Sequence, residues 1–479
     1  MGKAFYLTTT LPYVNADPHI GFALELVQAD IITRYHALQG DEIFFNTGTD
    51  EHGLKIFRKA EESNKDTQTY TDEYAAKFRE LKSTLNLYPE LHFIRTTDPK
   101  HKKAAQEMWK RCEAAGDIYK KKYKGLYCVG DEAFLKESDL VDGKCPNHPT
   151  MEPMEVEEEN YFFRLSKYQD TLLKYLSKEG VIVPEWRRLE AIKFVEQGLE
   201  DFSISRVKEK MPWGVAVPGD ESQVMYVWFD ALTNYISTLG WPDDTDTFER
   251  FWGTVGAPNA LQMAGKDQVR FQSVMWQAML MSAGLPSTKQ VIYHGFITSG
   301  GHKMSKSLGN VIDPLEIVNE YGADALRYFL ARHIHPFEDS DFTMERFKEA
   351  YNADLANGVG NVVARIMQLA EKNLPESVSV SFTPYPLEFA EAIQSFNFSE
   401  AVQYVWSRIQ ELDRKITETE PFKVIKADQE KGKTIIADLV RELAAIDLML
   451  EPILPGTSKA IITAIVANKK PENLFPRKE

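Results

Sequence analysis

The chain has 479 residues, of which 43% are hydrophobic and 27% are charged. This composition supports a packed core, predicts about three domains and argues against extended disorder. The formal net charge of −15 argues against indiscriminate binding of nucleic acid, although an acidic protein can still carry a local basic patch.

The sequence shows no sign of a membrane or secreted protein. No run of about 18 apolar residues is present, and residues 1–7 lead directly into a strand pattern without a cleavable apolar stretch. The cysteines number three, Cys112, Cys128 and Cys145, and such a small odd count suggests a reducing compartment. We therefore expect a cytoplasmic protein that does not contact membranes.

Strand and helix patterns alternate in the first part of the chain. A strand pattern over 4–10 runs into Pro12, helical spacing begins at Gly21, and a second strand pattern follows over 42–46. Further helical patterns lie at 54–63, 70–85 and 98–115. This alternation predicts an α/β fold with a doubly wound, Rossmann-like parallel sheet.

The pattern changes twice in the rest of the chain. Gly and Pro interrupt short apolar runs over 117–223, which we interpret as an inserted domain, and strand patterns then return at 224–228, 261–265 and 291–293. After about residue 345 only helical patterns remain, at 349–372, 386–395, 398–417 and 428–450. These predict an all-α helix bundle.

Five segments follow from these changes as predicted domains. Two sheet-forming halves at 1–116 and 224–297 enclose the insertion at 117–223. They are followed by a connecting region at 298–347 and the bundle at 348–479.

Residues Pro18–Gly21 lie where a strand and its loop lead into a helix. In a doubly wound fold, this is where backbone N–H groups and the helix dipole meet an anion. His19 at this point can donate a hydrogen bond to phosphate, and Gly21 lets the chain approach a nucleotide closely. By itself the motif is short, and the simpler interpretation is a loop histidine beside a helix start.

A second motif, Lys303–Ser307, carries two lysines and two serines between Gly301 and Gly309. Lysines on such a segment can neutralise the charge that builds on pyrophosphate during adenylyl transfer. The alternative is a solvated basic loop. The order and spacing of the two motifs together favour a nucleotide site.

With these motifs, the chain resembles the class I aminoacyl-tRNA synthetases, and closely the methionyl-tRNA synthetases. Further segments carry the resemblance nearly end to end: Leu11–Asn15, Gly48–Gly53, Tyr226–Ala231, Gly265–Asp267 and Gly322–Arg327. The resemblance implies a ligase that joins L-methionine and ATP into methionyl-adenylate with release of pyrophosphate. It then transfers methionine to the 3′-terminal ribose of tRNA(Met), for translation initiation and elongation. The resemblance also implies that 298–347 contacts the tRNA stem and that 348–479 binds the anticodon.

The resemblance assigns the methionine site to two loops, one aromatic stripe and one helix start. Asp50 matches the carboxylate that receives the substrate ammonium, and the other matching residues are Leu11, Tyr13, Trp228, Ala231, Leu232, Tyr235, Phe271 and Gln272. The stripe from Trp228 to Tyr235 is spaced i, i+3, i+4, i+7, so one helical face presents it. Without the other motifs, an ordinary core stripe is the simpler interpretation.

The same resemblance implies how ATP, accompanied by Mg²⁺, is held. His19, Lys303 and Lys306 contact the phosphates and are the expected catalytic residues, while Gly21 approaches adenine and Asp267 binds ribose. No side chain acts as a nucleophile, because the methionine carboxylate itself attacks the α-phosphorus. The protein mainly positions groups and stabilises charge.

Two residues depart from the family pattern. Phe22 stands where the first motif normally ends in a second histidine, and loss of that donor costs about 10²-fold in rate unless another group substitutes. Gln272 stands where the family usually has a histidine near the methionine sulfur, and its amide can still donate a hydrogen bond.

The insertion of related enzymes often carries paired cysteines that bind zinc. The matching residues here are Cys128, Asp131, Cys145 and His148, a set that can bind zinc tetrahedrally. The alternative is a zinc-free knuckle held by packing, because Asp131 and Glu132 resemble family members that have lost the metal.

Two polar residues, Asn361 and Arg365, stand four apart on the face opposite the apolar stripe of helix 349–372. In the family these positions read the anticodon, and Phe422 after Pro421 matches its stacking aromatic residue. Alone, the pair is more simply a solvated polar face. The chain stops where the family's core usually stops, so we expect a monomer.

Two other functions fit parts of the sequence. A class I synthetase for another amino acid is disfavoured, since 117–223 is shorter than the editing domains of the isoleucine, valine and leucine enzymes. A tRNA-binding paralogue without catalysis is suggested by Phe22 and Gln272 and disfavoured by the intact Lys303–Ser307 motif.

Overall fold

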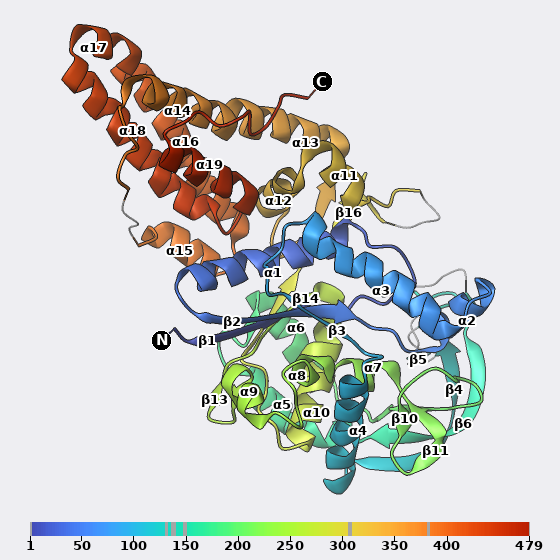
Figure 1. Ribbon diagram of the computed structural model, residues 1–479. Coiled ribbons are helices and arrows are strands. Elements are labelled where there is room, and N and C mark those ends of the chain that lie inside the picture. Colours follow the sequence, from blue (N-terminus) through green and yellow to red (C-terminus); the bar gives the residue numbers. More distant parts are fainter. Residues whose placement is uncertain are drawn as a thin grey trace. The chain divides into compact units, whose positions relative to one another are not determined.

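The computed structural model describes residues 2–129, 133–135, 140–146, 151–304, 309–380 and 384–478 (Figure 1). The chain forms two compact units. Unit 1 comprises Met1–Asp17, Asp41–Glu80 and Pro89–His294. Unit 2 comprises Pro18–Gly40, Leu81–Tyr88 and Gly295–Glu479.

A six-stranded sheet is the centre of unit 1, and every neighbouring pair of its strands is parallel (Figure 1). In spatial order the strands are β3 (His92–Arg95), β2 (Glu42–Thr49), β1 (Ala4–Thr8), β14 (Leu261–Gly265), β15 (Gln290–His294) and β7 (Ile182–Val183). The strand order reverses between β1 and β14, which is the topological switch point of a doubly wound sheet. The predicted α/β fold is confirmed.

Helices and buried tryptophans cover this sheet. The helices that lie wholly or partly in unit 1 are α2 (Leu54–Glu62), α3 (Thr67–Thr84), α4 (Pro99–Ala114), α5 (Gln169–Leu176), α6 (Glu185–Glu196), α7 (Val227–Ala231), α8 (Asn234–Ser237), α9 (Thr245–Phe251) and α10 (Trp276–Ser282). The ring of Trp252 lies 6.1 Å from that of Tyr6 on β1 and 6.0 Å from that of Trp276 on α10. These fully buried rings join strand to helix through apolar contact.

The segment predicted as an insertion forms small antiparallel sheets. One contains β5 (Ala133–Leu135), β4 (Ile118–Cys128), β6 (Met154–Phe163) and β8 (Phe202–Ser203). Lysines of β4 face glutamates of β6, with Lys122 opposite Glu159 and Lys124 opposite Glu157. Opposite charges on paired strands stabilise the pairing. The short strand β7 comes from the same segment yet pairs with β15, so the insertion also extends the parallel sheet.

Residues 224–228, expected to resume the parallel sheet, do not join it. Val224 and Met225 end β11 (Asp220–Met225), which pairs antiparallel with β9 (Ser205–Val207) and β10 (Ala216–Val217). The chain then turns into α7 at Val227. An apolar run of this length fits a strand or a buried helix equally, and the pairing with β9 decides between them. A further hairpin joins β12 (Gly253–Thr254) to β13 (Ala257–Pro258).

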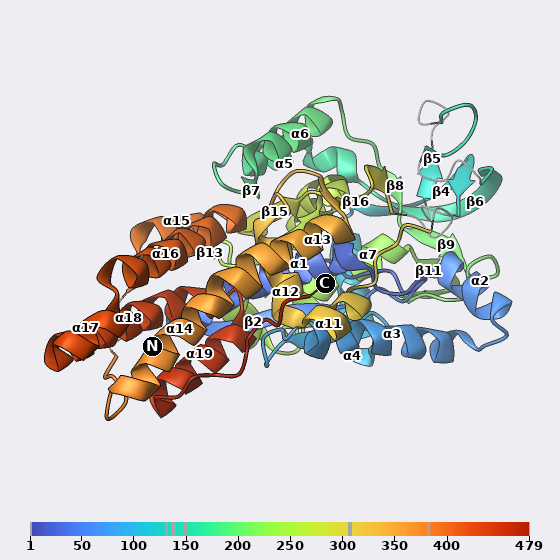
Figure 2. The same ribbon diagram turned by 90° about the horizontal axis from the view of Figure 1, so that it is seen from above.

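Unit 2 is mostly helical (Figure 2). Its small sheet contains β16 (Ile297–Ser299), β17 (His302–Lys303) and β18 (Ser340–Phe342). Its helices are α1 (Ile20–Leu38), α11 (Pro314–Tyr321), α12 (Ala323–Arg332), α13 (Met344–Ala350), α14 (Asn361–Asn373), α15 (Leu387–Gln394), α16 (Phe398–Thr419), α17 (Pro421–Ala427), α18 (Gln429–Leu450) and α19 (Pro455–Ala467). Helices α14, α16, α18 and α19 pack side by side, so the predicted helical C-terminal region is confirmed. No helix in the described ranges is long and apolar enough to span a membrane.

The helix expected over 349–372 is interrupted. A π-helical segment, Tyr351–Gly360, separates α13 from α14, and Gly358 within it has non-helical angles of φ −87° and ψ −106°. The wider π turn shifts the phase of the helix, yet the expected apolar stripe is still buried, with Leu355 and Ile366 both fully inaccessible.

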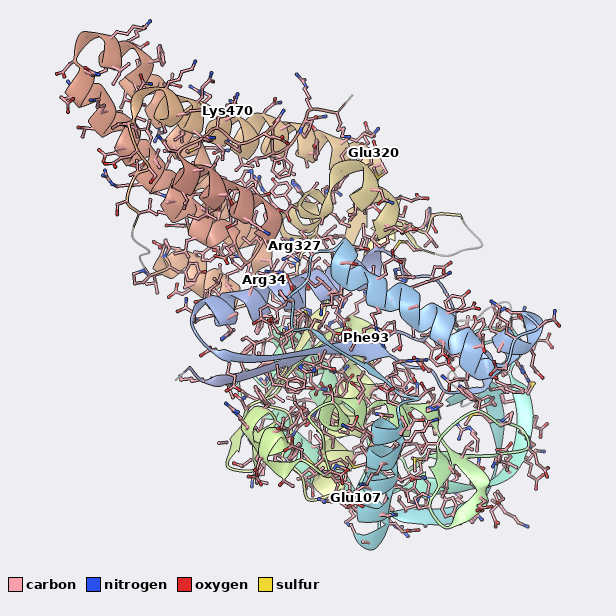
Figure 3. The ribbon with its side chains drawn as sticks, in the orientation of Figure 1. Arg34, Phe93, Glu107, Glu320, Arg327 and Lys470 are labelled. Atoms are coloured by element: carbon pink, nitrogen blue, oxygen red, sulfur yellow. The ribbon has the colours of Figure 1, made fainter. Side chains whose placement is uncertain are left out.

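A buried ion pair joins α1 to α12 within unit 2. Arg327 Nη2 lies 2.7 Å from Asp30 Oδ2, and neither side chain is exposed. Figure 3 labels Arg327 and the neighbouring Arg34 of α1. Asp30 also accepts a hydrogen bond from Arg34 Nε at 2.7 Å. The other guanidinium contacts are with the backbone carbonyls of Leu85, Pro452 and Ile453, at 3.2, 3.1 and 2.8 Å. The pair therefore has the surrounding hydrogen bonds that a buried ion pair requires.

Candidate functional site

The carboxyl edge of the parallel sheet holds the first group of predicted residues. Leu11 and Tyr13 follow β1, and Asp50 follows β2. Backbone hydrogen bonds join the two loops: Asp50 N–H donates to the Pro12 carbonyl at 2.9 Å, and Val14 N–H donates to the Asp50 carbonyl at 3.2 Å. Asp50 is 7% exposed, and Leu11 and Tyr13 are half-buried. The structure therefore places these three residues together.

An aromatic stack forms the second group in unit 1. The rings of Trp228 and Phe271 are 3.8 Å apart and nearly parallel, at 11°. Trp228 lies on α7, and Phe271 begins the π-helical turn η4 (Phe271–Met275). Both rings are half-buried, so a flat apolar surface remains available to a ligand. Such a surface suits a flexible, polarizable side chain.

The remaining stripe residues are more deeply buried than the two stacked rings. Ala231, Leu232 and Tyr235 are all buried, and the helix that carries them breaks between α7 and α8. Tyr235 holds its place through two contacts of its own. Its backbone carbonyl accepts a hydrogen bond from Tyr6 at 2.6 Å, and its ring packs edge-on against Trp276 at 5.8 Å.

Gln272 connects η4 to the tyrosine of the stripe. Its Nε2 donates to Tyr235 Oη at 2.7 Å, and the side chain is 1% exposed. Its Oε1 has no hydrogen-bond partner among the described residues. A buried acceptor without a partner is costly, so this oxygen suits a group supplied by a ligand or by water.

Asp267, the residue predicted to bind ribose, follows β14 in a short 3₁₀ turn, η3 (Lys266–Gln268). Its side chain is exposed, and Oδ2 accepts a hydrogen bond from Gln268 Nε2 at 3.0 Å. It therefore extends from the switch-point edge of the sheet, where nucleotides bind in doubly wound folds.

In unit 2, His19 caps the N-terminus of α1. Its Nδ1 accepts a hydrogen bond from the Gly21 N–H at 3.1 Å. Burial lowers the pKa of His19 to about 4, so the imidazole is neutral near pH 7. Because Nδ1 is an acceptor, the proton of the neutral ring lies on Nε2, the nitrogen able to donate to a phosphate oxygen.

The neighbours of His19 explain two residues of its motif. A Cβ on Gly21 would lie 2.8 Å from His19 Cε1, so any side chain at that position would displace the imidazole. The ring of Phe22 packs against the imidazole, with ring centroids 4.4 Å apart. Phe22, expected from the family resemblance to replace a second histidine, thus contributes to the burial of His19.

The two predicted lysines are described only in part. Lys303 ends β17, where its backbone pairs with Thr298. Its side chain lies outside the described atoms, and Lys306 lies outside the described residues.

The predicted anticodon residues lie on the helical part of unit 2. Asn361 is exposed at the start of α14, and Phe422 is 44% exposed on α17. Arg365 is half-buried and forms an ion pair with Asp413 of α16. The guanidinium of Arg365 is therefore already paired with a carboxylate.

The cysteines of the predicted zinc site, Cys128 and Cys145, are both buried. Asp131 and His148 lie outside the described residues. Within the described ranges, no cluster of three or more potential metal-ligating side chains occurs.

One buried group near the methionine residues was not predicted. The Asp230 carboxylate lies 3.2 Å from His52 Nδ1 and 3.5 Å from His101 Nε2, and all three side chains are buried. The signal was present in the sequence, because a carboxylate inside an apolar stripe requires buried partners. His52 and Asp230 also stand in two of the segments that carry the family resemblance.

Comparison with known proteins gives a consistent result. The family described as "tRNA synthetases class I (M)" matches residues 5–152 and 149–367. A methionine–tRNA ligase of Thermotoga maritima is 40% identical over 98% of this chain and 76% of its own length. One from Brucella suis is 39% identical over 98% of this chain and 93% of its own length.

A solved structure agrees with these relatives. Methionyl-tRNA synthetase of Mycobacterium tuberculosis, in complex with methionyl-adenylate, superimposes with a TM-score of 0.88 at 35% identity. The match covers 100% of this chain and 99% of that one. The chain therefore belongs to the class I tRNA synthetases, and within them to the methionine–tRNA ligases.

Proposed function

We propose that this chain charges tRNA(Met) with methionine, and that the roles of its residues divide between the two units. The chain activates L-methionine with ATP and transfers it to tRNA, as its family membership indicates. Observations in each unit support the residue assignments. The strongest structural support for these assignments is the Trp228–Phe271 stack together with the buried Tyr235–Gln272 hydrogen bond.

In unit 1, Asp50 pairs with the substrate ammonium, and the Trp228–Phe271 stack supports the thioether. Leu11, Tyr13, Ala231, Leu232 and Tyr235 complete the apolar enclosure. Gln272 stands where the family usually has a histidine near the sulfur. Its unpartnered Oε1 accepts a hydrogen bond from water or another donor in the pocket, since a thioether sulfur has no hydrogen to donate. Because its Nε2 is already held by Tyr235, the amide is fixed in one orientation.

The residues proposed to hold ATP, with Mg²⁺, are the histidine, glycine, aspartate and lysines named in the two motifs and after β14. His19 donates from Nε2 to a phosphate oxygen, Gly21 lets adenine approach, and Asp267 binds ribose. Lys303 and Lys306 neutralise the triphosphate. The support for His19 is its neutral imidazole and the cap that fixes its tautomer.

The chemistry is a displacement at phosphorus. A carboxylate oxygen of methionine forms a bond to the α-phosphorus, and the bond from that phosphorus to the bridging oxygen of pyrophosphate breaks. Negative charge moves onto the leaving pyrophosphate, where the lysines stabilise it. A hydroxyl of the tRNA's terminal ribose then attacks the methionyl carbonyl and releases AMP.

The tRNA anticodon is read by Asn361 and Arg365, with Phe422 stacking on a base. To contact a base, Arg365 must break its ion pair with Asp413. A wrong base that offers no hydrogen-bond acceptor does not compensate for this loss, so its binding free energy is less favourable. We further propose that the protein acts as a cytoplasmic monomer.

The buried Cys128 and Cys145 thiols are compatible with an insertion that binds zinc and with one that does not. Zinc is bound by Cys128, Asp131, Cys145 and His148, or the segment is a zinc-free knuckle held by packing. Metal analysis of protein purified with zinc present distinguishes them. Stoichiometric zinc that is lost in Cys145→Ser supports the site, whereas zinc-free folded protein rejects it.

ATP–pyrophosphate exchange across a panel of amino acids tests the whole assignment. We expect exchange with methionine only, and a loss of methionine affinity in Trp228→Ala. Trp186→Ala is the matched control, since Trp186 is an exposed tryptophan of α6. Exchange with another amino acid would indicate a different class I synthetase. No exchange with any amino acid, together with tight tRNA binding, would identify a non-catalytic paralogue.

A further inference from the structure

Three elements that carry proposed methionine contacts also carry members of one buried polar chain. In each element, the buried member stands two residues after the proposed contact. The pairs are Asp50 and His52, Trp228 and Asp230, and Tyr235 and Ser237. A fourth member, His101 of α4, lies between the last two elements.

Each of the four members lies within 3.5 Å of the next, although Asp230 Oδ2 and His101 Nε2 form ion-pair contacts without hydrogen-bond geometry among the described residues. His52 Nδ1 lies 3.2 and 3.4 Å from the two oxygens of Asp230. His101 Nε2 lies 3.5 Å from Asp230 Oδ1, and His101 Nδ1 lies 2.9 Å from Ser237 Oγ. The four residues are at most 4% exposed. No water therefore competes for these contacts from bulk solvent.

The charge of Asp230 strengthens the arrangement. Burial raises its pKa, but the adjacent imidazoles of His52 and His101 outweigh burial and hold the pKa of Asp230 below its ordinary value. Asp230 is therefore ionised at neutral pH. A buried carboxylate is stable only while its partners keep their places, so small shifts of these elements are opposed.

Asp230 does not reach the face that Trp228 presents. Residues two apart on a helix point in different directions, so Trp228 stacks on Phe271 while Asp230 turns toward α4 and the Asp50 loop. We infer that Asp230 is a positioning residue, and this inference rests on the proposed methionine pocket. It fixes α7 against the Asp50 loop and so sets the span between the ammonium-binding and thioether-binding groups.

A second anchor acts on the same loop without replacing this role. Glu51 receives both Arg95 Nε and Arg95 Nη2, at 2.7 and 2.8 Å. Arg95 ends β3, so this bidentate pair ties the loop to the parallel sheet. The Asp230 contacts join the same loop to α7, the element that carries Trp228.

Asp230→Asn tests the inference, because it removes the charge with little change in volume. We expect the methionine KM in ATP–pyrophosphate exchange to rise between about tenfold and about a hundredfold, as for misplaced binding groups. The ATP KM is expected to stay within about twofold, and kcat to change less than the methionine KM.

The matched control is Asp117→Asn. Asp117 is another fully buried carboxylate of unit 1, held by Lys167 at 2.6 Å, Ser282 at 2.8 Å and Tyr168. It lies outside the proposed site. An equal rise in methionine KM in this control would show general loosening of the unit and overturn the inference, as would an unchanged methionine KM in Asp230→Asn.

Ser237→Ala decides the question if Asp230→Asn does not fold. It removes the last link of the chain while keeping nearly the same volume, and we expect a methionine KM about threefold higher with an unchanged ATP KM. An unchanged methionine KM rejects the inference. The wild-type protein separates the two proposals: no methionine-dependent exchange rejects the proposed function itself, whereas normal exchange with a normal Asp230→Asn rejects only the positioning role.

Discussion

The residues of unit 1 proposed to bind methionine and the residues of unit 2 proposed to bind phosphate are held in different ways. Trp228 and Tyr235 each contact side chains from distant parts of the sequence. His19 and Gly21 depend mainly on their own helix start. An apolar substrate differs from its competitors by about 1–3 kcal/mol per methylene, so its selection needs a shape fixed by tertiary contacts. Phosphates are bound by charge and backbone groups, which a local motif supplies.

The largest effect that separates the two regions is expected for Lys306→Ala. Loss of one charge that stabilises the leaving pyrophosphate lowers the rate of adenylation by about 10²–10³-fold. Methionine affinity should remain nearly unchanged, since the lysine acts in the transition state. Rapid-quench adenylation and equilibrium methionine binding measure the two quantities. Lys348→Ala, which removes an exposed lysine of α13, is the control; equal losses of rate and affinity in Lys306→Ala would contradict the assignment.

In the proposed methionine site we expect a smaller effect, which changes methionine binding more than the rate of adenylation. Tyr235→Phe and Gln272→Ala should each raise the methionine KM about tenfold while changing kcat less. Because the two side chains share one hydrogen bond, the double variant should cost less than the sum of the single changes. Exchange kinetics on all four proteins provide the cycle. Additive effects would show that the hydrogen bond does not hold the pocket.

The pH profile of Phe22→Ala examines the local construction of the nucleotide motif. Burial keeps the pKa of His19 near 4, so wild-type His19 stays neutral down to about that pH. Removal of the phenyl ring exposes the imidazole, and its pKa should rise toward about 6.5. Protonation then removes the Nδ1 acceptor for the Gly21 N–H. We expect exchange at pH 5.5, relative to pH 7.5, to fall about fivefold more than in the wild type.

Two measurements make this pH test decisive. NMR titration of His19 reports its pKa directly. Phe22→Leu keeps an apolar cover and should retain a profile close to that of the wild type. Identical profiles for Phe22→Ala and wild type would show that other residues bury the imidazole.

The smallest effect is expected in the helix bundle. Burial, with help from the charge of Glu451, raises the pKa of Asp447 to about 8, and its Oδ1 has no hydrogen-bond partner within the described ranges. Because the pKa in the folded protein lies above the ordinary value of 3.8, the stability contributed by the protonated form is fully present below about pH 4 and is lost progressively as pH rises from there through about 8. Asp447→Asn should therefore raise Tm by about 2–5 °C at pH 8.5 and change it little at pH 4.

Calorimetry at the two pH values checks this stability difference. Asp438→Asn is the control, since Asp438 is an exposed residue of the same helix paired with Arg441. Methionine KM should be unchanged in both variants. A changed methionine KM in Asp447→Asn would show that the helix bundle influences the proposed methionine site, and would contradict the expectation that the two act independently.

The sequence predicts local structure well where the apolar residues recur at one clear helical spacing. The expected helix 428–450 corresponds to α18, Gln429–Leu450, and the helix expected from Gly21 begins at Ile20. It predicts poorly where pairing decides the outcome. The two residues of β7 carry no strand pattern, and residues 224–228 have an apolar run that α7 and β11 share.

In the candidate site, the identities of the residues could be predicted from the sequence, but their tertiary contacts could not. The sequence names Trp228, Phe271 and Gln272 through family resemblance, but the stack and the hydrogen bond to Tyr235 join residues distant along the chain. Asp230 was passed over for a related reason. Its partners come from the Asp50 loop and α4, and only packing reveals which elements supply them.

The buried Arg327 also limits how this protein can be shortened. Its guanidinium needs the carbonyls of Pro452 and Ile453 as well as the carboxylate of Asp30. A truncated protein that ends at residue 450 would expose one side of this ion pair and loosen α1, the helix that His19 caps. A shortened protein intended to keep α1 in place should therefore retain the turn at 452–453.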